Sequence, residues 1–134
     1  MSDQRLFSEV LHSENPSAQA RRLIREACSS WPSHRADDAE IAVGELVANA
    51  VLHGNGPVTI RIVVDLSFLR VEVIDANSQH PRTLDLPPPS VEAEHGRGLY
   101  IVSALVDAWG SVNLDAGSRQ GKAVWFELRR DTAP

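Results

Sequence analysis

Apolar residues recur with a helical period in three stretches of the chain, and the first stretch follows Asn15. Its apolar positions are three or four residues apart, the spacing of one helix face; they are Ala20, Leu23, Ile24, Ala27 and Trp31. Asn15 is suited to cap this helix, and Pro16 is suited to its first position. The pattern therefore predicts a helix that begins at Pro16.

Two further helices are predicted from the same kind of pattern. The segment PSHRADDAE interrupts the first helix, and Asp37 or Asp38 can cap the second. The second helix runs to about His53, where the glycines of GNGP are typical of a helix C-terminus. The third helix is predicted within GRGLYIVSALVDAWG, and its apolar residues are Leu99, Val102, Leu105, Val106 and Trp109.

Alternation of apolar and other residues predicts strands in the rest of the chain. It is weak over residues 6–10 and clear in VTIRIVVD and LRVEVID, whose short link predicts an antiparallel hairpin. SVNL and GKAVWFEL are expected as the last two strands, around a DAGSRQG turn. This order predicts an α+β fold: a two-layer α/β sandwich with a mixed, mainly antiparallel sheet and helices on one face.

The segment from Ala76 to His95, ANSQHPRTLDLPPPSVEAEH, is too rich in proline for regular structure. A loop of this length inside a small domain is more often a binding loop or a lid than a plain connection.

Composition narrows the class of protein. The chain has 134 residues, 43% of them hydrophobic, which suits a single domain (1–134) with its own core. A net charge of −5 without a Lys/Arg run argues against a nucleic-acid surface. No apolar stretch is long enough to span a membrane, MSDQRLFSEV lacks the apolar core of a signal peptide, and Cys28 is the only cysteine. We therefore expect a cytoplasmic protein.

Glu45, Asn49 and His53 stand at every fourth position of the otherwise apolar stretch ELVANAVLHG. This spacing places them in one row along a helix. The row either faces solvent or lines a cavity, and the apolar residues around it, among them Val47 and Ala50, keep the cavity reading open. Asparagine offers an oxygen ligand for Mg²⁺, and a carboxylate one turn earlier can accept a proton from an attacking hydroxyl. His53 could hold phosphate or simply cap the helix end.

Two other places carry candidate binding chemistry. Asp75 ends the strand LRVEVID, where it could accept a hydrogen bond from adenine or be an ordinary turn aspartate. Gly96 and Gly98, directly before the third predicted helix, would let a phosphate approach the backbone, and Arg97 could add a charged contact. Glycines also serve as turns, and neither a dinucleotide fingerprint nor a P-loop is present.

Taken together, these stretches resemble the nucleotide-binding domain shared by gyrase, Hsp90, histidine kinases and MutL (the GHKL type). The resemblance is closest to anti-sigma-factor serine/threonine kinases and related actinobacterial regulatory ATP-binding proteins. GELVANAVLHG is similar to the family's N-box, VIDANS to its first glycine box and GRGLYIVSALVDAWG to its second. GKAVWFEL stands where the last strand of the family lies. The resemblance implies the Bergerat-type ATP-binding fold, with ATP and Mg²⁺ as cofactors.

The resemblance also implies roles for individual residues. Glu45 would be the catalytic carboxylate and Asn49 the Mg²⁺ ligand. Asp75 would recognise adenine, and His53 would lie near the edge of the pocket. The remaining cofactor-binding positions implied by the boxes are Asn77, Gly96, Arg97, Gly98, Leu99 and Ala123.

Two positions depart from the family pattern. Asn77 replaces a glycine of the first glycine box, although asparagine tolerates a left-handed backbone better than most residues. Ala123 stands near the place of a small hydroxyl residue, usually threonine, that assists adenine or the water beside Asp75. The loss of that hydroxyl is expected to weaken nucleotide binding. The segment 76–95 is also short for a full ATP lid.

In function, the chain resembles an ATP-dependent serine/threonine kinase that acts as an anti-sigma factor. Such a protein captures a sigma factor and phosphorylates an antagonist protein of the STAS type. The alternative is a catalytically weak or inactive ATP-binding or protein-binding switch, which acts by partner binding alone. The resemblance implies a homodimer. No direct nucleic-acid contact and no membrane contact are expected, and the apolar residues around Trp31 are read as core before they are read as a docking patch.

Overall fold

The structure is a computed structural model. It describes residues 4–12, 14–53, 56–75, 94–114 and 121–130, with the backbone alone at 53 and 94–97. The elements in chain order are β1 (Arg5–Val10), α1 (Pro16–Ala27), α2 (Ser33–His53), β2 (Thr59–Val64), β3 (Phe68–Asp75), α3 (Glu94–Leu105), β4 (Ala108–Asn113) and β5 (Lys122–Arg129).

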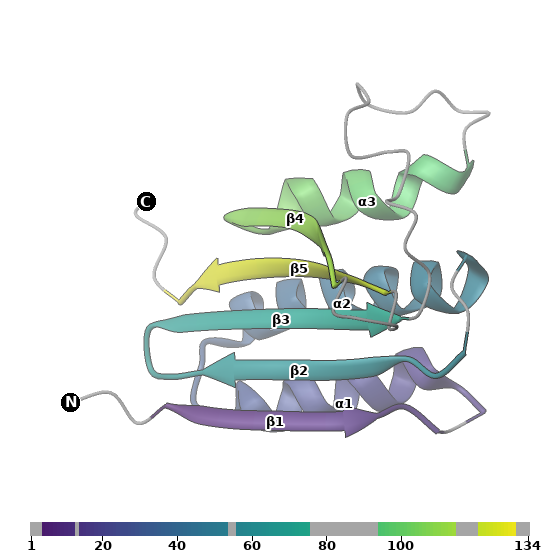
Figure 1. Ribbon diagram of the computed structural model, residues 1–134. Coiled ribbons are helices and arrows are strands. Elements are labelled where there is room, and N and C mark those ends of the chain that lie inside the picture. The colour runs from purple at the N-terminus through teal and green to yellow at the C-terminus, as the bar shows by residue number, and fades with distance from the viewer. Residues whose placement is uncertain (1–3, 13, 54–55, 76–93, 115–120, 131–134) are drawn as a thin grey trace.

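The strands form one sheet in the order β1-β2-β3-β5-β4 (Figure 1). Every pair of neighbouring strands described is antiparallel, so the sheet is antiparallel rather than mixed. Helices α1 and α2 lie behind the sheet in Figure 1, and α3 contacts α2 near β4. The predicted α+β fold, with helices against one face of the sheet, is confirmed.

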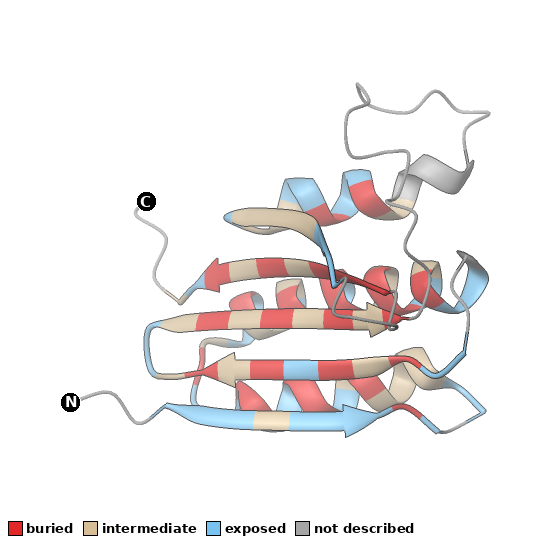
Figure 2. Ribbon diagram, in the orientation of Figure 1, coloured by how far each residue is buried: buried red, intermediate tan, exposed pale blue. Residues whose placement is uncertain are grey.

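The core lies between the helices and the sheet. Alternate residues of β3 are buried, and the strand therefore shows regular bands of burial in Figure 2. The fully buried larger side chains come from both layers; they are Ile24, Val43, Leu46, Val47, Ile60, Ile62, Val64, Leu69, Val71, Leu99, Phe126 and Leu128. This is the arrangement that period-two strands and period-3.6 helices produce when their apolar faces meet.

The start of α1 is as predicted. The Asn15 side-chain oxygen accepts a hydrogen bond from the Ala18 backbone N–H at 3.1 Å, and Pro16 occupies the first turn. Trp31, beyond the end of α1, is 6% exposed, and its indole N–H donates to the Asp65 carbonyl at 2.9 Å. Trp31 therefore belongs to the core, which confirms that reading.

Two predicted helix boundaries are wrong. Helix α2 begins at Ser33, so neither Asp37 nor Asp38 caps it, because the Pro32 carbonyl already accepts the first helical hydrogen bonds. The third helix ends at Leu105, and the predicted helical residue Trp109 lies in β4 opposite Phe126. The spacing of the apolar residues near Trp109 is compatible with a helix or a strand, and pairing with β5 makes this segment a strand.

The hairpin between β2 and β3 is confirmed, and its turn is held by Asp65. The Asp65 carboxylate accepts hydrogen bonds from the backbone N–H groups of Ser67 and Phe68 at 2.8 and 2.9 Å. These bonds stabilise the ionised form, so the pKa of Asp65 is lowered, chiefly by Ser67.

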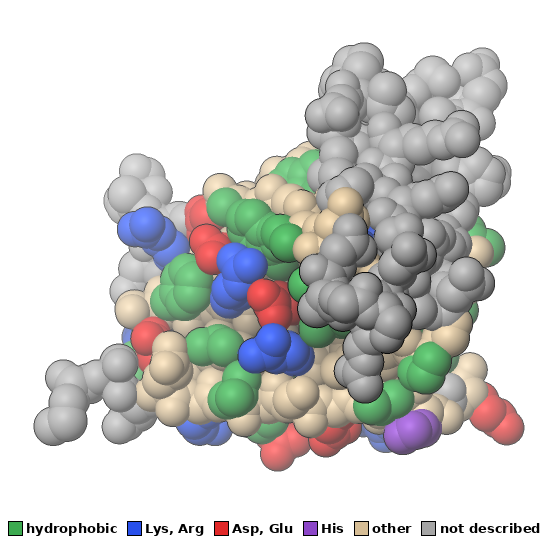
Figure 3. All heavy atoms as spheres, in the orientation of Figure 1, with side chains coloured by type: hydrophobic (Ala, Val, Ile, Leu, Met, Phe, Trp, Pro, Cys, Tyr) green, Lys and Arg blue, Asp and Glu red, His purple; other side chains and the backbone are tan. Residues whose placement is uncertain are grey.

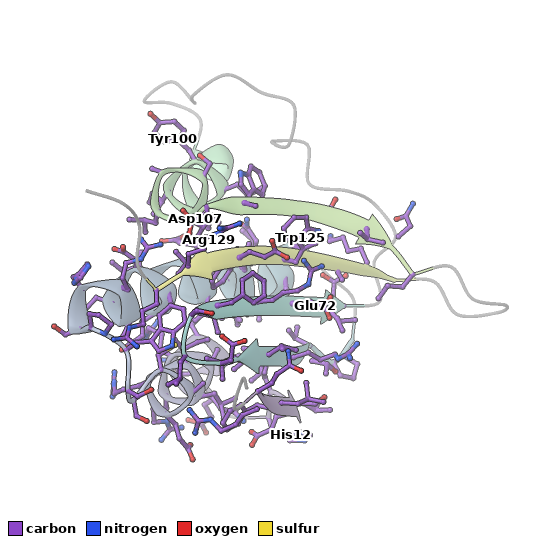
Figure 4. All side chains as sticks on the ribbon, turned by 90° about the vertical axis from the view of Figure 1, so that its left-hand side faces the viewer. His12, Glu72, Tyr100, Asp107, Trp125 and Arg129 are labelled. Atoms are coloured by element: carbon purple, nitrogen blue, oxygen red, sulfur yellow. The ribbon has the colours of Figure 1, made fainter. Side chains whose placement is uncertain are left out.

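The sheet face away from the helices carries charged side chains over its middle strands (Figure 3). Arg70 contacts Glu127 at 2.6 Å and Glu72 at 3.3 Å, and its guanidinium lies 4.4 Å from the centre of the Trp125 ring. Figure 4 shows Glu72 and Trp125 on the same side of the sheet. In the described part of the chain, no helix is both long and apolar enough to cross a membrane.

Candidate functional site

Glu45 lies where α2 meets α3. It is half-buried, and a methyl group built at Gly98 of α3 would lie only 2.8 Å from its Oε2 atom. A distance below 3.0 Å does not occur for real Cβ atoms, so the glycine is what lets the carboxylate approach α3 this closely. The sequence thus brings an acid of the second helix against the N-terminal half of the third.

Asn49 is also half-buried, one turn after Glu45 on α2. The apolar residues of this helix are not buried on every side. Ile41, Val51 and Leu52 are 47%, 54% and 66% exposed. The described part of the polar row therefore lies at the border between the exposed face of α2 and its buried face, partly accessible from solvent.

Asp75 is the last residue of β3 and is buried, with 1% of its side chain exposed. It shares the helix-facing side of β3 with Leu69, Val71 and Val73, which are buried in the core. The Lys122 ammonium lies 3.7 Å from its Oδ2 atom, and the lysine side chain is 6% exposed. A buried carboxylate of this kind is costly unless it is compensated, and the ammonium provides compensating charge.

Position 123 does not lie beside Asp75. In the β3–β5 register, Lys122 is opposite Asp75, and Ala123 is opposite Ile74. Because neighbouring residues of a strand point to opposite faces, Ala123 lies on the side of the sheet away from the helices. The expectation that its missing hydroxyl acts next to Asp75 is therefore wrong; the residue in that place is Lys122.

Sequence reasoning missed Lys122, although a signal was present. Lys122 shares the strand alternation of Val124, Phe126 and Leu128, which are all buried in the core. A lysine in phase with core residues is unusual, since lysine is seldom buried without a partner. The register that supplies the partner could not be read from the sequence.

The other predicted residues are placed less completely. Gly96 and Arg97 lie in the first turns of α3, which begins at Glu94, so these positions are inside the helix and not before it. Leu99 is 2% exposed and packs in the core. His53 is the last residue of α2, and its side chain lies outside the described residues, as does all of Asn77.

These residues are suited to a nucleotide with a divalent cation. The approach of Glu45 to α3 and the buried Asp75 supply two carboxylates, and Asn49 supplies a neutral oxygen. Among the described side chains, no three His, Cys, Asp or Glu residues gather as a metal cage. Mg²⁺ is commonly held by one or two protein oxygens together with phosphates and water, so a single asparagine ligand is compatible with it.

A separate groove of about 550 Å³ lies along α1. Its lining residues are Glu14, Asn15, Ala18, Arg21, Arg22 and Arg25. Arg21 approaches Gly44 on the α1 side of α2, whereas Glu45 approaches Gly98 on the α3 side. The groove therefore does not contain the predicted site residues.

Comparison with known proteins agrees with this geometry. A family described as "Histidine kinase-like ATPase domain" matches residues 13–128. A comparison with curated proteins gives no match. The matched range includes all three helices and runs from before α1 almost to the end of β5. Because the match covers most of the chain, the protein belongs to the family of histidine kinase-like ATPase domains.

Proposed function

We propose that this ATPase-type domain is a serine/threonine protein kinase that also acts as an anti-sigma factor. It would capture a sigma factor and phosphorylate a STAS-type antagonist of that capture. Membership of the family implies ATP binding. The observation that carries the kinase proposal is the contact of the Glu45 carboxylate with α3 at Gly98, with Asn49 one turn away.

Each residue has a defined task in this proposal. ATP supplies the phosphoryl group, which passes to a serine or threonine hydroxyl of the antagonist and leaves ADP. Glu45 accepts the proton of that hydroxyl, and Asn49 would hold Mg²⁺ through its side-chain oxygen. Asp75 would accept a hydrogen bond from the amino group of adenine. The first turns of α3 offer backbone N–H groups for phosphate.

The alternative is a switch that binds its partners without transferring phosphate. One of the two departures behind this alternative moves by one residue, because the position opposite Asp75 holds Lys122, which has no hydroxyl group either, and not Ala123. The other, at Asn77, lies outside the described residues. We favour the kinase because Glu45 and Asn49, the residues that phosphate transfer requires, are both present on α2.

Phosphate transfer tests the proposal. The purified protein is incubated with Mg²⁺, γ-labelled ATP and STAS-domain proteins of the same organism, and label on serine or threonine is measured. Glu45→Gln should lower transfer at least about 100-fold, because a general base contributes 10²–10⁴-fold. Its affinity for ATP should stay within about threefold, because the amide keeps the size of the acid.

Glu40→Gln is the matched control for this experiment. Glu40 is on the same helix, but it pairs with Arg25 of α1 at 2.9 Å and takes no part in the proposed site. It should transfer phosphate like the wild type. Transfer by Glu45→Gln at the wild-type rate would contradict the role of Glu45, and ATP binding without any transfer would favour the switch.

We also propose that the protein forms a homodimer, on the strength of the resemblance. Light scattering after gel filtration should give twice the chain mass of 14.7 kDa. A single-chain mass at every concentration tested would contradict it.

A further inference from the structure

Lys122 is unusual in two respects. It is the only lysine among the 13 basic residues of the chain, and its side chain is 6% exposed. Lysine is almost never this buried unless it is paired. Its ammonium lies 3.7 Å from Asp75 Oδ2, beyond the 2.7–2.9 Å typical of a charge-assisted hydrogen bond. The pair is therefore held in contact by charge without a short hydrogen bond between these two atoms.

The pair belongs to a line of polar residues at one end of the sheet, which is separate from the polar row of α2. Asp75 of β3 is opposite Lys122 of β5, which is opposite Asn113 of β4. One step inward, Val73 is opposite Val124, and both are buried. The helix-facing side of these strands thus changes from apolar to polar at the last paired residues, next to the carboxylate that the proposed function assigns to adenine.

The chemistry of the two groups is complementary to a nucleobase edge. A carboxylate accepts hydrogen bonds through two oxygens and about four lone-pair positions, so several donors can share one carboxylate. The ammonium has three donors and no acceptor. In adenine, the amino group is a donor with a ring nitrogen acceptor on either side of it. An acceptor and a donor side by side can therefore bind both.

We propose that Lys122 and Asp75 bind adenine together. Asp75 accepts a hydrogen bond from the amino group of adenine, and Lys122 donates one to a ring nitrogen next to that amino group. This inference rests on the proposed function, because it requires the base to lie at Asp75. It makes Lys122 a specificity-determining residue that contacts the nucleotide. The alternative is that the buried Asp75–Lys122 pair only stabilises the fold. This explanation is weaker, since replacing a buried ion pair by apolar residues is often neutral or stabilising.

Base analogues test this in the wild-type protein. Affinities for ATP, 1-deaza-ATP and 7-deaza-ATP are compared by calorimetry; each analogue lacks one of the two ring nitrogens. One of them should bind at least about tenfold more weakly than ATP, the loss expected when a charged donor is left without its acceptor. Equal affinity for all three would overturn the inference and leave the proposed function standing. No binding of ATP itself would overturn both.

Lys122→Met then assigns the loss to this residue. The variant should bind ATP about tenfold more weakly and show no further loss with the discriminating analogue, as a double-mutant cycle requires. The inference would be overturned if the variant bound the analogue as much more weakly than ATP as the wild type does, or if it bound ATP more tightly than the wild type. Circular dichroism checks that the variant is folded.

The single lysine offers a readout that needs no variant. Protein labelled with [¹⁵N]lysine has one side-chain nitrogen signal, because Lys122 is the only lysine. That signal should shift on addition of ATP and shift less with the discriminating analogue. The same response to both nucleotides would overturn the inference even if Lys122→Met does not fold.

Discussion

At the scale of single residues, the contact between Glu45 and Gly98 determines where the proposed catalytic carboxylate can lie. Gly98 is inside α3, and no positive backbone φ is found there, so its role is space for the acid. The closest atom to a new methyl group would be Glu45 Oε2, the end of a flexible side chain. An added methyl group would therefore move the carboxylate and leave the helix in place.

Gly98→Ala should accordingly separate activity from stability. Phosphate transfer should fall at least about tenfold, because misplacement of a catalytic group by about 1 Å can cost 10²-fold. The free energy of unfolding should be unchanged or higher, by up to about 1 kcal/mol, because alanine favours helix over glycine. Transfer assays and urea unfolding measure the two quantities.

Gly44→Ala is the control for that variant. Gly44 precedes Glu45 on α2, but a methyl group there would meet the Arg21 guanidinium of α1 at 3.2 Å. Its transfer rate should be close to that of the wild type. If both variants lose activity equally, the proximity of Gly98 to Glu45 is not what matters.

Cys28 gives a prediction about pH at the same scale. Burial raises the pKa of its thiol to about 12, from an ordinary value of 9.0. Between these values the unfolded chain loses a proton that the folded chain keeps, so the free energy of unfolding falls as pH rises. The Cys28 contribution to this slope is about 1.4 kcal/mol per pH unit at most.

Urea unfolding of the wild type and of Cys28→Ala between pH 8 and 11 checks this. The wild type should lose stability more steeply than the variant above pH 9, and native Cys28 should react slowly with thiol reagents. Parallel slopes for the two proteins would show that the thiol is not the titrating group.

At the scale of the elements, Arg35 connects the start of α2 to the end of β5. Its guanidinium donates to Asp38 and to Asp107 at 3.1 Å each, and to the Arg129 carbonyl at 3.0 Å. Figure 4 shows Asp107 and Arg129 next to each other, and the Arg129 N–H donates to the same Asp107 carboxylate at 2.6 Å. The Arg35 side chain is 8% exposed, whereas the side chains of Asp38 and Asp107 are 28% and 33% exposed, so the arginine is the buried end of these contacts.

Arg35→Ala should therefore lower the free energy of unfolding by about 3 kcal/mol, the lower part of the range for breaking a buried ion pair. Arg25→Ala is the control: Arg25 also pairs with a carboxylate, that of Glu40, but its side chain is 66% exposed, and the loss should be below about 1 kcal/mol. Chemical denaturation measures both. Similar losses would mean that burial does not decide the strength of these pairs.

ATP affinity should change little in the folded Arg35 variant. Arg35 contacts Arg129, the last residue of β5, whereas Lys122 is the first residue of that strand. The two features are at opposite ends of the same strand.

At the scale of the whole molecule, most of the fold could be predicted because β2, β3 and α1 each show a single clear period of apolar residues. The alternation in β2 and β3 and the apolar stripe of α1 lead directly to an antiparallel sheet under helices. The boundaries at Ser33 and Leu105 could not be predicted, because they depend on a proline carbonyl and on pairing between β4 and β5. Both boundaries are set by hydrogen bonds, and the spacing of apolar residues along the sequence does not show where these bonds form.

For the candidate site, the sequence predicts the residues, and the structure gives the positions of some of them. Glu45, Asn49 and Asp75 follow from motif resemblance, and the structure adds the approach of Glu45 to Gly98. The neighbour of Asp75 was misassigned by one residue, because a one-residue difference in register moves a side chain to the other face of the sheet. The roles of all the predicted site residues, Glu45, Asn49 and Asp75 included, stay predictions.

The central claim is that the polar row of α2 is part of a magnesium-dependent ATP site. Calorimetric titration with ATP, with and without Mg²⁺, tests it most directly in the wild type, in Asn49→Ala and in Gln19→Ala, which removes an amide from α1 instead. The account predicts binding that Mg²⁺ strengthens, loss of that strengthening in Asn49→Ala, and wild-type behaviour in Gln19→Ala. No binding at millimolar ATP, or equal magnesium dependence in all three proteins, would contradict it.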